Sequence, residues 1–237
     1  MKSRWVSALA LGMACLALGA WAGARWMSRA EAVKASFHTL YHKRGESTYQ
    51  STYWLGVHTQ QSPLDMWVFQ EILYETRPDV LVETGTFKGG SAYFFASLFD
   101  LMKRGRVITI DIEEHKNRPQ HERITYLLGS STSPEILRKV RSLIAPGQRV
   151  MVVLDSDHRK AHVAQELKVY SELVTVGCYL VVEDTHFNGH PILPKYGPGP
   201  MEAVREFLRS NPQFYPDRSR EKFFMTFNPE GYLRRSR

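Results

Sequence analysis

The sequence predicts an α/β fold with a doubly wound, mostly parallel, Rossmann-like sheet, preceded by an N-terminal transmembrane or signal helix. Three observations support this prediction: short apolar runs alternate with amphipathic stretches, a Gly-containing turn follows the first run, and acidic residues follow several of the others. Such alternation is typical of parallel strands with helices on both faces. With 43% hydrophobic and 23% charged residues, the chain has the composition of a globular protein.

The first expected element is the apolar run over residues 5–24, which contains no charged residue. A helix of this length spans about 30 Å, enough to cross a bilayer. We expect an uncleaved anchor with a cytoplasmic catalytic domain. The alternative is secretion after signal cleavage, because Lys2 and Arg4 precede the run and Ala20-Trp21-Ala22 resembles a cleavage site. The net charge of +7 suits an anionic membrane surface, and no nucleic-acid-binding signature is present.

The chain is expected to have three parts: a membrane anchor or signal segment over residues 1–30, a helical lead-in and lid over 31–75, and the catalytic domain over 76–237. Ser62 and Pro63 resemble the N-cap and first turn of a helix that should end before Pro78. The two cysteines, Cys15 and Cys178, form no disulfide framework and fit a reducing compartment.

The elements of the catalytic domain follow from the alternation of patterns. The predicted strands are Val80 to Glu83, Val107 to Asp111, Ile124 to Leu128, Val150 to Leu154 and Tyr179 to Val182. The predicted helices are Ser91 to Lys103, Pro134 to Ile144, Ala161 to Leu173 and Met201 to Arg209. Near the end, Phe223 to Phe227 and the turn Asn228-Pro229-Glu230-Gly231 predict a final pair of strands, at least one of them antiparallel.

Ligands of open α/β sheets bind beyond the carboxyl ends of the strands. The first strand leads into a turn whose residues we expect at a cofactor: Glu83, Gly85, Thr86, Gly89 and Ser91. The next strand ends at Asp111, whose oxygens suit the hydroxyls of a ribose. The turn lacks the dinucleotide fingerprint and the P-loop lysine, and an acid there would repel a pyrophosphate but attract a cationic sulfonium. These features favour S-adenosylmethionine; the alternative is a tight turn followed by a helix cap.

Four carboxylates follow two later strands: Asp155 and Asp157 after one, Glu183 and Asp184 after the next. If these strands are adjacent, the carboxylates repel one another unless a cation lies among them. All-oxygen ligands favour Mg²⁺ or Mn²⁺. The alternative is that two of the acids cap helices while the others pair with Arg159 or Lys160.

A dication would acidify a substrate hydroxyl and position it opposite the methyl donor. Lys160 is the candidate general base, with His158 as the alternative. The Pro- and Gly-rich stretch over residues 188–200 cannot continue a strand or helix and is interpreted as an acceptor-binding loop, or else as an ordinary connector. His186 and His190 are either contacts of this loop or surface residues.

The motifs as a set resemble the cephalosporin hydroxylase and rhamnosyl O-methyltransferase family over residues 60 to about 235. The resemblance is carried by Val82-Glu83-Thr84-Gly85-Thr86 with Gly89-Gly90-Ser91, Ile110-Asp111-Ile112, Leu154-Asp155-Ser156-Asp157-His158, Val182-Glu183-Asp184-Thr185 and Gly197-Pro198-Gly199-Pro200-Met201-Glu202-Ala203. Members look like class I S-adenosylmethionine-dependent enzymes with a Mg²⁺ site, and some methylate glycolipid sugars.

The resemblance implies a role for each site residue. The methionine end of the cofactor would lie by Glu83 and Gly85, its ribose by Asp111, and its adenine near Ser130 or Ser131. The implied metal ligands are Glu183 and Asp184 with either Asp157, which is favoured, or Asp155. The same motif implies Lys160 as the base.

The predicted function is therefore Mg²⁺-assisted O-methylation of a hydroxyl on a glycan, glycolipid or secondary metabolite. One alternative is a noncatalytic S-adenosylmethionine-binding partner of another tailoring enzyme, and another is a secreted metal hydrolase. The expected partners are the acceptor molecule and the membrane but not nucleic acid, and a homo-oligomer is compatible with the sequence.

Overall fold

The computed structural model describes residues 28–237, so the apolar run predicted to enter the membrane lies outside the described residues. The chain divides into two compact units, residues 1–40 and residues 41–237. In the first unit, residues 28–40 are helical and expose Val33, Phe37 and Leu40. Within residues 28–237, none of the helices combines the length and apolar character that a membrane span requires.

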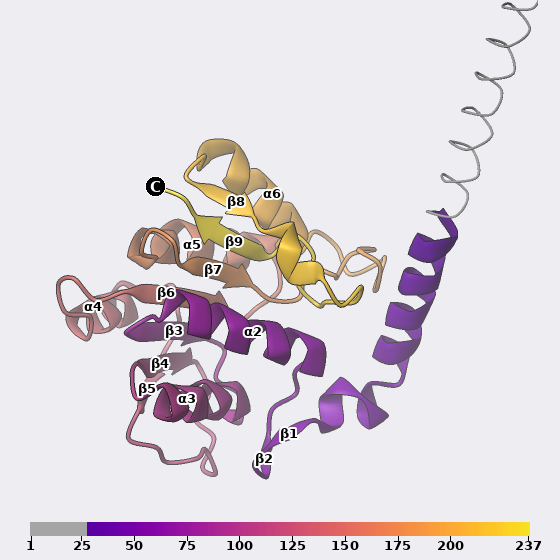
Figure 1. Cartoon of the computed structure of the whole chain (residues 1–237). Coiled ribbons are helices and arrows are strands. Elements are labelled where there is room, and N and C mark those ends of the chain that lie inside the picture. Colours follow the sequence, from indigo (N-terminus) through magenta and orange to yellow (C-terminus); the bar gives the residue numbers. More distant parts are fainter. Residues whose placement is uncertain (1–27) are drawn as a thin grey trace, which may run out of the picture. The chain divides into compact units, whose positions relative to one another are not determined.

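The second unit is built on a seven-stranded sheet with the order β5-β4-β3-β6-β7-β9-β8 (Figure 1). Five strands run parallel: β3 (Val80–Thr84), β4 (Arg106–Asp111), β5 (Ile124–Leu128), β6 (Val150–Leu154) and β7 (Tyr179–Val182). At the other edge, β9 (Tyr232–Arg235) pairs antiparallel with both β7 and β8 (Phe214–Pro216). The chain order reverses at β3, so the mostly parallel, Rossmann-like sheet predicted from the sequence is confirmed.

Helices cover both faces of this sheet. The helices are α2 (Pro63–Thr76), α3 (Gly90–Met102), α4 (Pro134–Ser142), α5 (Lys160–Tyr170) and α6 (Pro200–Ser210). One apolar core joins α2 and α3 to Leu81 and Met151, and the other joins α4, α5 and α6 to Val80 and Val152. Successive strand residues point to opposite faces, and both faces are covered, which explains why the central strands β6 and β7 are apolar at every position.

Local sequence sets several of the element boundaries. The Ser62 hydroxyl accepts a hydrogen bond from the Asp65 N–H, Pro63 occupies the first turn of α2, and Arg77 ends the helix in a left-handed conformation before Pro78. The helix predicted at 161–173 is divided into α5 and a 3-10 turn, Ser171–Leu173. Residues 45–58 form two further 3-10 turns, Gly45–Ser47 and Tyr49–Ser51, and the hairpin β1 (Tyr53–Trp54) and β2 (Val57–His58).

The prediction of a strand over Phe223 to Phe227 is wrong, and β8 takes that place in the sheet. Phe224 has φ = 66°, outside the strand region. The Thr226 hydroxyl and the Phe227 N–H donate hydrogen bonds to the buried carboxylate of Asp65 on α2 instead of pairing with a strand. A polar contact with a distant helix therefore decides the conformation of this segment.

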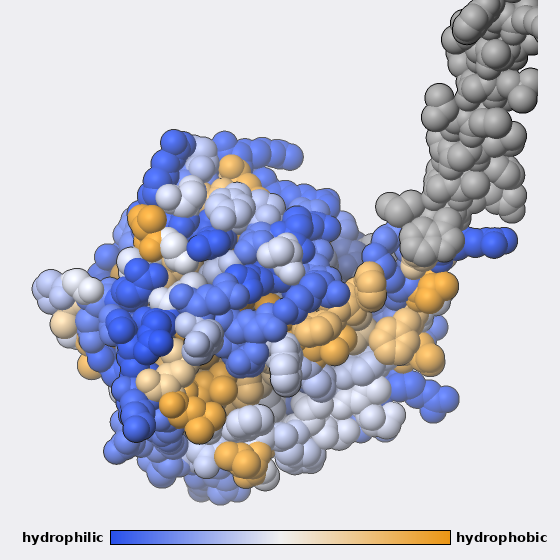
Figure 2. Space-filling model, viewed as in Figure 1, coloured by the Kyte–Doolittle hydropathy of each residue, from blue (hydrophilic) through white to orange (hydrophobic). Residues whose placement is uncertain are grey.

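The face viewed in Figure 2 is mainly hydrophilic, and its apolar residues lie in separate patches. Large exposed apolar side chains of α2 include Trp67 and Tyr74. Such scattered apolar residues are normal on a protein surface.

Candidate active site

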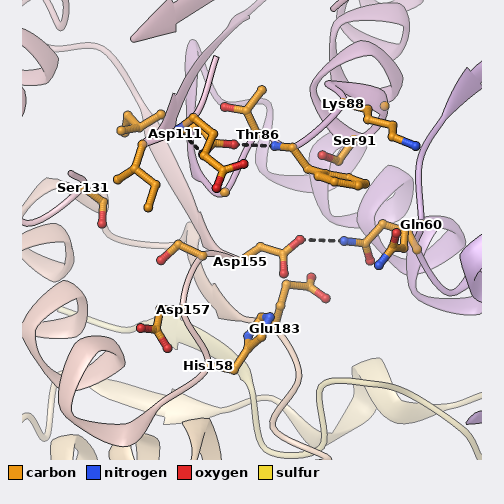
Figure 3. A pocket seen from close by; sticks show the side chains of 18 of the residues that line it. Gln60, Thr86, Lys88, Ser91, Asp111, Ser131, Asp155, Asp157, His158 and Glu183 are labelled. Atoms are coloured by element: carbon orange, nitrogen blue, oxygen red, sulfur yellow. Dashed lines mark hydrogen bonds between the residues drawn. The ribbon is translucent and has the colours of Figure 1, made fainter. Parts of the chain in front are cut away.

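A cavity of about 530 Å³ lies at the carboxyl ends of the parallel strands. Loops that follow β3, β4, β5, β6 and β7 all contribute to its wall (Figure 3). This is the edge at which the sequence predicted ligand binding. Six of the predicted cofactor residues line it, namely Gly85, Thr86, Ser91, Asp111, Ser130 and Ser131.

Two glycines keep the turn after β3 close to its neighbours. Gly85 has φ = +88°, and a Cβ built on it would lie 1.8 Å from the backbone oxygen of Asp155. A Cβ on Gly90 would lie 2.3 Å from the backbone oxygen of His58. No other residue fits at either position without moving backbone, so the glycines bring the peptide groups of this turn to the cavity wall.

The structure places Glu83 and Gly89 behind the cavity wall. Glu83 is 1% exposed, and the Thr109 hydroxyl donates a hydrogen bond to its Oε2. Burial raises the pKa of Glu83 to about 7, although hydrogen bonds from Ser91 and Thr109 act against the increase. Glu83 therefore lies beneath the turn and is not among the residues that line the cavity.

Asp111 lines the cavity and organises the loops around it. Its Oδ2 accepts hydrogen bonds from the Phe87 N–H at 2.7 Å and from Arg118 Nη2 at 2.9 Å, and its Oδ1 accepts one from the Glu113 N–H at 3.0 Å. These contacts fix the carboxylate and partly balance its charge. A carboxylate oxygen can accept two hydrogen bonds, so Oδ1 retains acceptor capacity for a ligand hydroxyl.

Three acidic residues from adjacent strand ends gather in the cavity. Glu183 is 2% exposed, and its Oε1 has no hydrogen-bond partner among the residues that the structure describes. Asp155, His158 and Asp184 each offer a ligand atom within 4.8 Å of the others. Gln61 Nε2 donates a hydrogen bond to Asp155 Oδ2 at 2.8 Å (Figure 3).

Burial raises the pKa of Asp155, and repulsion from Asp184 adds to the increase. Burial and repulsion from Asp155 likewise raise the pKa of Glu183. An ionised carboxylate in such surroundings is costly without a nearby cation. The cluster thus has the electrostatics and the ligand set of a divalent-metal site.

Asp157, the favoured third ligand, lines the cavity but lies apart from Asp155 and Glu183 (Figure 3). Its carboxylate forms an ion pair with Arg159, whose Nε lies 3.0 Å from Oδ1 and Oδ2. The hydrogen bond from Arg159 lowers the pKa of Asp157 to about 2. In this structure Asp155, the alternative, occupies the position beside Glu183 and Asp184.

The two candidate bases differ in position. His158 lines the cavity, with Nε2 at 3.1 Å from Asp184 Oδ2. Lys160 does not line it, and its Nζ forms an ion pair with Glu206 of α6 at 2.7 Å. The structure therefore does not bring the predicted base Lys160 to the reaction site.

Sequence reasoning missed several polar residues that support the site. Asn228 Oδ1 accepts a hydrogen bond from the Asp184 N–H at 3.0 Å. Gln61, Ser156 and His162 line the cavity. Gln61 and Asn228 belong to no sequence pattern that predicts a ligand contact. Ser156 could have been predicted from its position between Asp155 and Asp157, two candidate metal ligands.

Comparisons with known proteins show the family to which the chain belongs. Residues 46–236 match the family model described as Rhamnosyl O-methyltransferase/CmcI. The chain is 38% identical over 211 residues to the rhamnosyl O-methyltransferase of Mycobacterium leprae (strain TN), covering 86% of this chain and 90% of the relative. It is 37% identical over 214 residues to the rhamnosyl O-methyltransferase of Mycobacterium bovis (strain BCG / Pasteur 1173P2), covering 87% and 86%.

Solved structures with similar folds include a CmcI apo-structure, with a TM-score of 0.61 and 22% identity over 79% of this chain and 77% of that chain. A second CmcI structure, described as Mg-SAM, has a TM-score of 0.61 and 23% identity over 79% of this chain and 78% of that chain. The methyltransferase class predicted from the sequence is confirmed. The chain belongs to the rhamnosyl O-methyltransferase/CmcI family.

Proposed function

We propose that this protein is an S-adenosylmethionine-dependent, Mg²⁺-assisted O-methyltransferase that acts on a sugar hydroxyl of a glycan or glycolipid. The observation that carries the proposal is a single cavity that joins a glycine turn and Asp111 to the crowded carboxylates Asp155, Glu183 and Asp184. The names of the rhamnosyl O-methyltransferase relatives and the CmcI structure described as Mg-SAM support it.

The residues at one end of the cavity fit S-adenosylmethionine. Gly85 and Gly90 let the turn after β3 pack directly against the backbone of Asp155 and His58, which shapes this end of the cavity. Asp111 retains acceptor capacity for ribose hydroxyls, and the acidic surroundings suit a sulfonium and an ammonium group. When bound, this cofactor supplies a methyl group whose bond to sulfur breaks as the acceptor oxygen bonds to carbon, giving a methyl ether, S-adenosylhomocysteine and a proton.

The acidic end of the cavity fits Mg²⁺. Glu183 carries a buried oxygen without a protein partner among the described residues, and carboxylate oxygens are the ligands that this hard cation prefers. Asp155 and Asp184, which offer ligand atoms within 4.8 Å of each other, would hold the ion, and Glu183 lines the cavity beside them as a third carboxylate. A bound ion would lower the pKa of an acceptor hydroxyl and orient it.

The proton of the acceptor hydroxyl needs an acceptor within the cavity. His158 is positioned for this role because it lines the cavity and its Nε2 lies beside Asp184. A carboxylate next to an imidazole orients the ring. We therefore assign His158 as the general base.

Aromatic side chains next to the carboxylates favour a sugar as the acceptor. Tyr49 and Phe227 line the cavity, with their ring centroids 5.1 Å apart in an edge-to-face arrangement. Phe187, three residues after Asp184, packs against His158 at 5.4 Å and against Tyr196 at 4.9 Å. Aromatic rings offer flat apolar surface, which suits the C–H face of a pyranose. Tyr196 belongs to the predicted acceptor loop over residues 188–200.

We also propose that residues 5–24 anchor the catalytic domain at the cytoplasmic face of a membrane. The uncharged length of this run supports an anchor, and a cytosolic methyl donor requires a cytoplasmic active site. Such an anchor would keep the cavity near glycolipid acceptors.

Replacing Glu183 and Asp184 together by Ala should reduce Mg²⁺-dependent methyl transfer more than about 100-fold, because several kcal/mol of electrostatic stabilisation is lost. The measurement is S-adenosylhomocysteine formation from S-adenosylmethionine and a phenyl rhamnoside, with Mg²⁺ or with EDTA. The matched control replaces the exposed acids Glu135 and Glu172 by Ala and should keep wild-type activity. Equal rates with Mg²⁺ and EDTA would contradict the metal-assisted mechanism.

His158→Ala should lower kcat about 100-fold or more, the usual contribution of a positioned general base. Lys160→Ala should change kcat by less than about 3-fold, because this ammonium group is paired with Glu206 outside the cavity. Steady-state kinetics with saturating Mg²⁺ compare the two variants. The opposite ranking would assign the base to Lys160.

Glu183→Gln should stabilise the metal-free protein in mildly alkaline buffer by about 1 kcal/mol, which raises the melting temperature by about 2 to 4 °C. A carboxyl group whose pKa is raised by folding destabilises the protein as the pH rises through that pKa. The difference from wild type should therefore disappear in acidic buffer, where Glu183 is protonated. Millimolar MgCl₂ should raise the melting temperature of wild type but not of the variant.

Thermal melts across a pH series check both effects, with Glu135→Gln as the exposed control. A variant that melts below wild type at every pH, or that keeps the full Mg²⁺ effect, would argue against a charged metal ligand at this position.

A further inference from the structure

The carboxylate of Glu202, in the first turn of α6, accepts hydrogen bonds from both ends of the loop over residues 188–200. Its Oε1 accepts from Asn188 Nδ2 at 3.1 Å and from His190 Nε2 at 2.9 Å, and its Oε2 accepts from the Gly199 N–H at 2.6 Å. Figure 1 shows this loop running from β7 to α6. One side chain thus ties the start of the loop to its end.

The Glu202 carboxylate is well suited to this role because it is ionised at neutral pH. Burial acts to raise its pKa, but the hydrogen bonds from His190, the Gly199 N–H and Asn188 outweigh burial and lower the pKa of Glu202 to about 2. An ionised carboxylate forms stronger hydrogen bonds than a neutral acceptor does. The loop is therefore closed by charge-assisted contacts.

The backbone of this loop depends on such contacts. Residues 188–199 form turns and bends but no helix or strand, and two residues other than glycine are left-handed, Asn188 with φ = 57° and Leu193 with φ = 48°. This conformation is unfavourable for most side chains. Asn188 Oδ1 also accepts a hydrogen bond from the Gly197 N–H at 3.2 Å. Polar contacts that converge on Glu202 and Asn188 thus hold a backbone that is unfavourable by itself.

The loop supports the wall of the cavity beside the carboxylates. The Tyr196 ring packs 4.9 Å from the Phe187 ring, which lies 5.4 Å from the ring of His158 in the cavity wall. The Lys160 N–H donates a hydrogen bond to the backbone oxygen of Pro198 at 3.0 Å. A loop released from Glu202 would therefore withdraw the aromatic surface that we assign to the sugar acceptor.

We propose that Glu202 is a positioning residue for the acceptor: it holds the loop over residues 188–200 against Phe187 and so sets the affinity for the sugar. Neither Glu202 nor its hydrogen-bond partners in the loop line the cavity, so they act on the acceptor through Tyr196 and Phe187. This inference rests on the proposed function in that a sugar binds beside these rings. It adds the residue that controls sugar binding and leaves the cofactor and the metal unaffected.

The first test is steady-state kinetics of Glu202→Leu in the full chain, with S-adenosylmethionine and a phenyl rhamnoside. Leucine has a similar size but accepts no hydrogen bond. The KM for the rhamnoside should rise about 10-fold or more, while kcat changes less than about 3-fold and the KM for S-adenosylmethionine less than about 2-fold. Glu206→Leu, one turn further along α6, is the matched control and should change neither KM, because Glu206 pairs with Lys160 outside the cavity.

A second pair of variants changes a donor and keeps Glu202. Glutamine can place its Nε2 where the Nε2 of histidine lies, so His190→Gln still donates to Glu202 and should keep the wild-type KM for the rhamnoside. His190→Leu donates nothing and should raise this KM about 3-fold or more. These two variants keep the test decisive if Glu202→Leu does not fold.

Limited proteolysis gives a readout that needs no acceptor. Lys195 lies in the loop and is exposed, so trypsin can cut after it when the loop opens. Glu202→Leu and His190→Leu should be cut at this bond about 5-fold or more faster than wild type, whereas Glu206→Leu and His190→Gln should match wild type. Mass spectrometry of the fragments identifies this cut among the other tryptic sites.

The outcomes separate this inference from the proposed function. If wild type methylates the rhamnoside but folded Glu202→Leu and His190→Leu keep its KM, or raise the KM for S-adenosylmethionine equally, the role of Glu202 is wrong and the proposed function stands. Unchanged cutting after Lys195 in both variants would also contradict the role of Glu202. If wild type methylates no sugar, the proposed acceptor is wrong and the inference fails with it.

Discussion

The organising constraint of this protein is the repulsion among carboxylates that the parallel sheet brings together. β6 and β7 are neighbours and run in the same direction, so the residues that follow them reach the same edge. Asp155 follows β6, and Glu183 and Asp184 follow β7. The sheet is held by two apolar cores, so these acids cannot move apart without disrupting the strands. A cation in the cavity resolves this conflict, and the same acidity suits a positively charged methyl donor.

The surrounding structure holds the acids in place through polar contacts from distant parts of the chain. Asp65 of α2 accepts hydrogen bonds from the Phe227 N–H at 2.9 Å and from the Tyr232 hydroxyl at 2.8 Å. These contacts fix the segment before β9, whose Asn228 accepts the hydrogen bond from the Asp184 N–H. Helix α2 and the segment before β9 thus both help to position Asp184, one of the candidate metal ligands. Burial raises the pKa of Asp65, so this support itself depends on a costly buried acid.

Much of the fold could be predicted from the sequence because its signals are local. Strands buried on both faces are mainly apolar, and Ser62 followed by Pro63 is a typical helix start. The carboxyl ends of such strands then indicate where the site lies. The prediction of a strand over Phe223 to Phe227 was wrong because the Phe227 N–H, which would have paired with a neighbouring strand, donates a hydrogen bond to Asp65 instead. Asp65 is far from this segment in the sequence.

The same reasoning explains why some predicted site residues have other partners in the structure. Lys160 and Asp157 lie in the predicted loop, but Glu206 and Arg159 provide partners that spacing alone does not reveal. Strand residues alternate between the two faces of the sheet, so the Glu83 side chain lies behind the cavity wall. There it accepts a hydrogen bond from the Thr109 hydroxyl of β4. His162 lines the cavity, but its helical spacing with Glu166 is common in any amphipathic helix and does not point to the site.

The most direct test of the central claim is calorimetric titration of the metal-free protein with Mg²⁺ near neutral pH in two buffers of different ionisation enthalpy, which counts the protons released. Our account predicts that Mg²⁺ binds and displaces protons from Asp155 and Glu183, and that this release declines as the pH rises. Absence of binding, or binding without any proton release across the pH range, would contradict the conclusion that crowded carboxylates form the cation site.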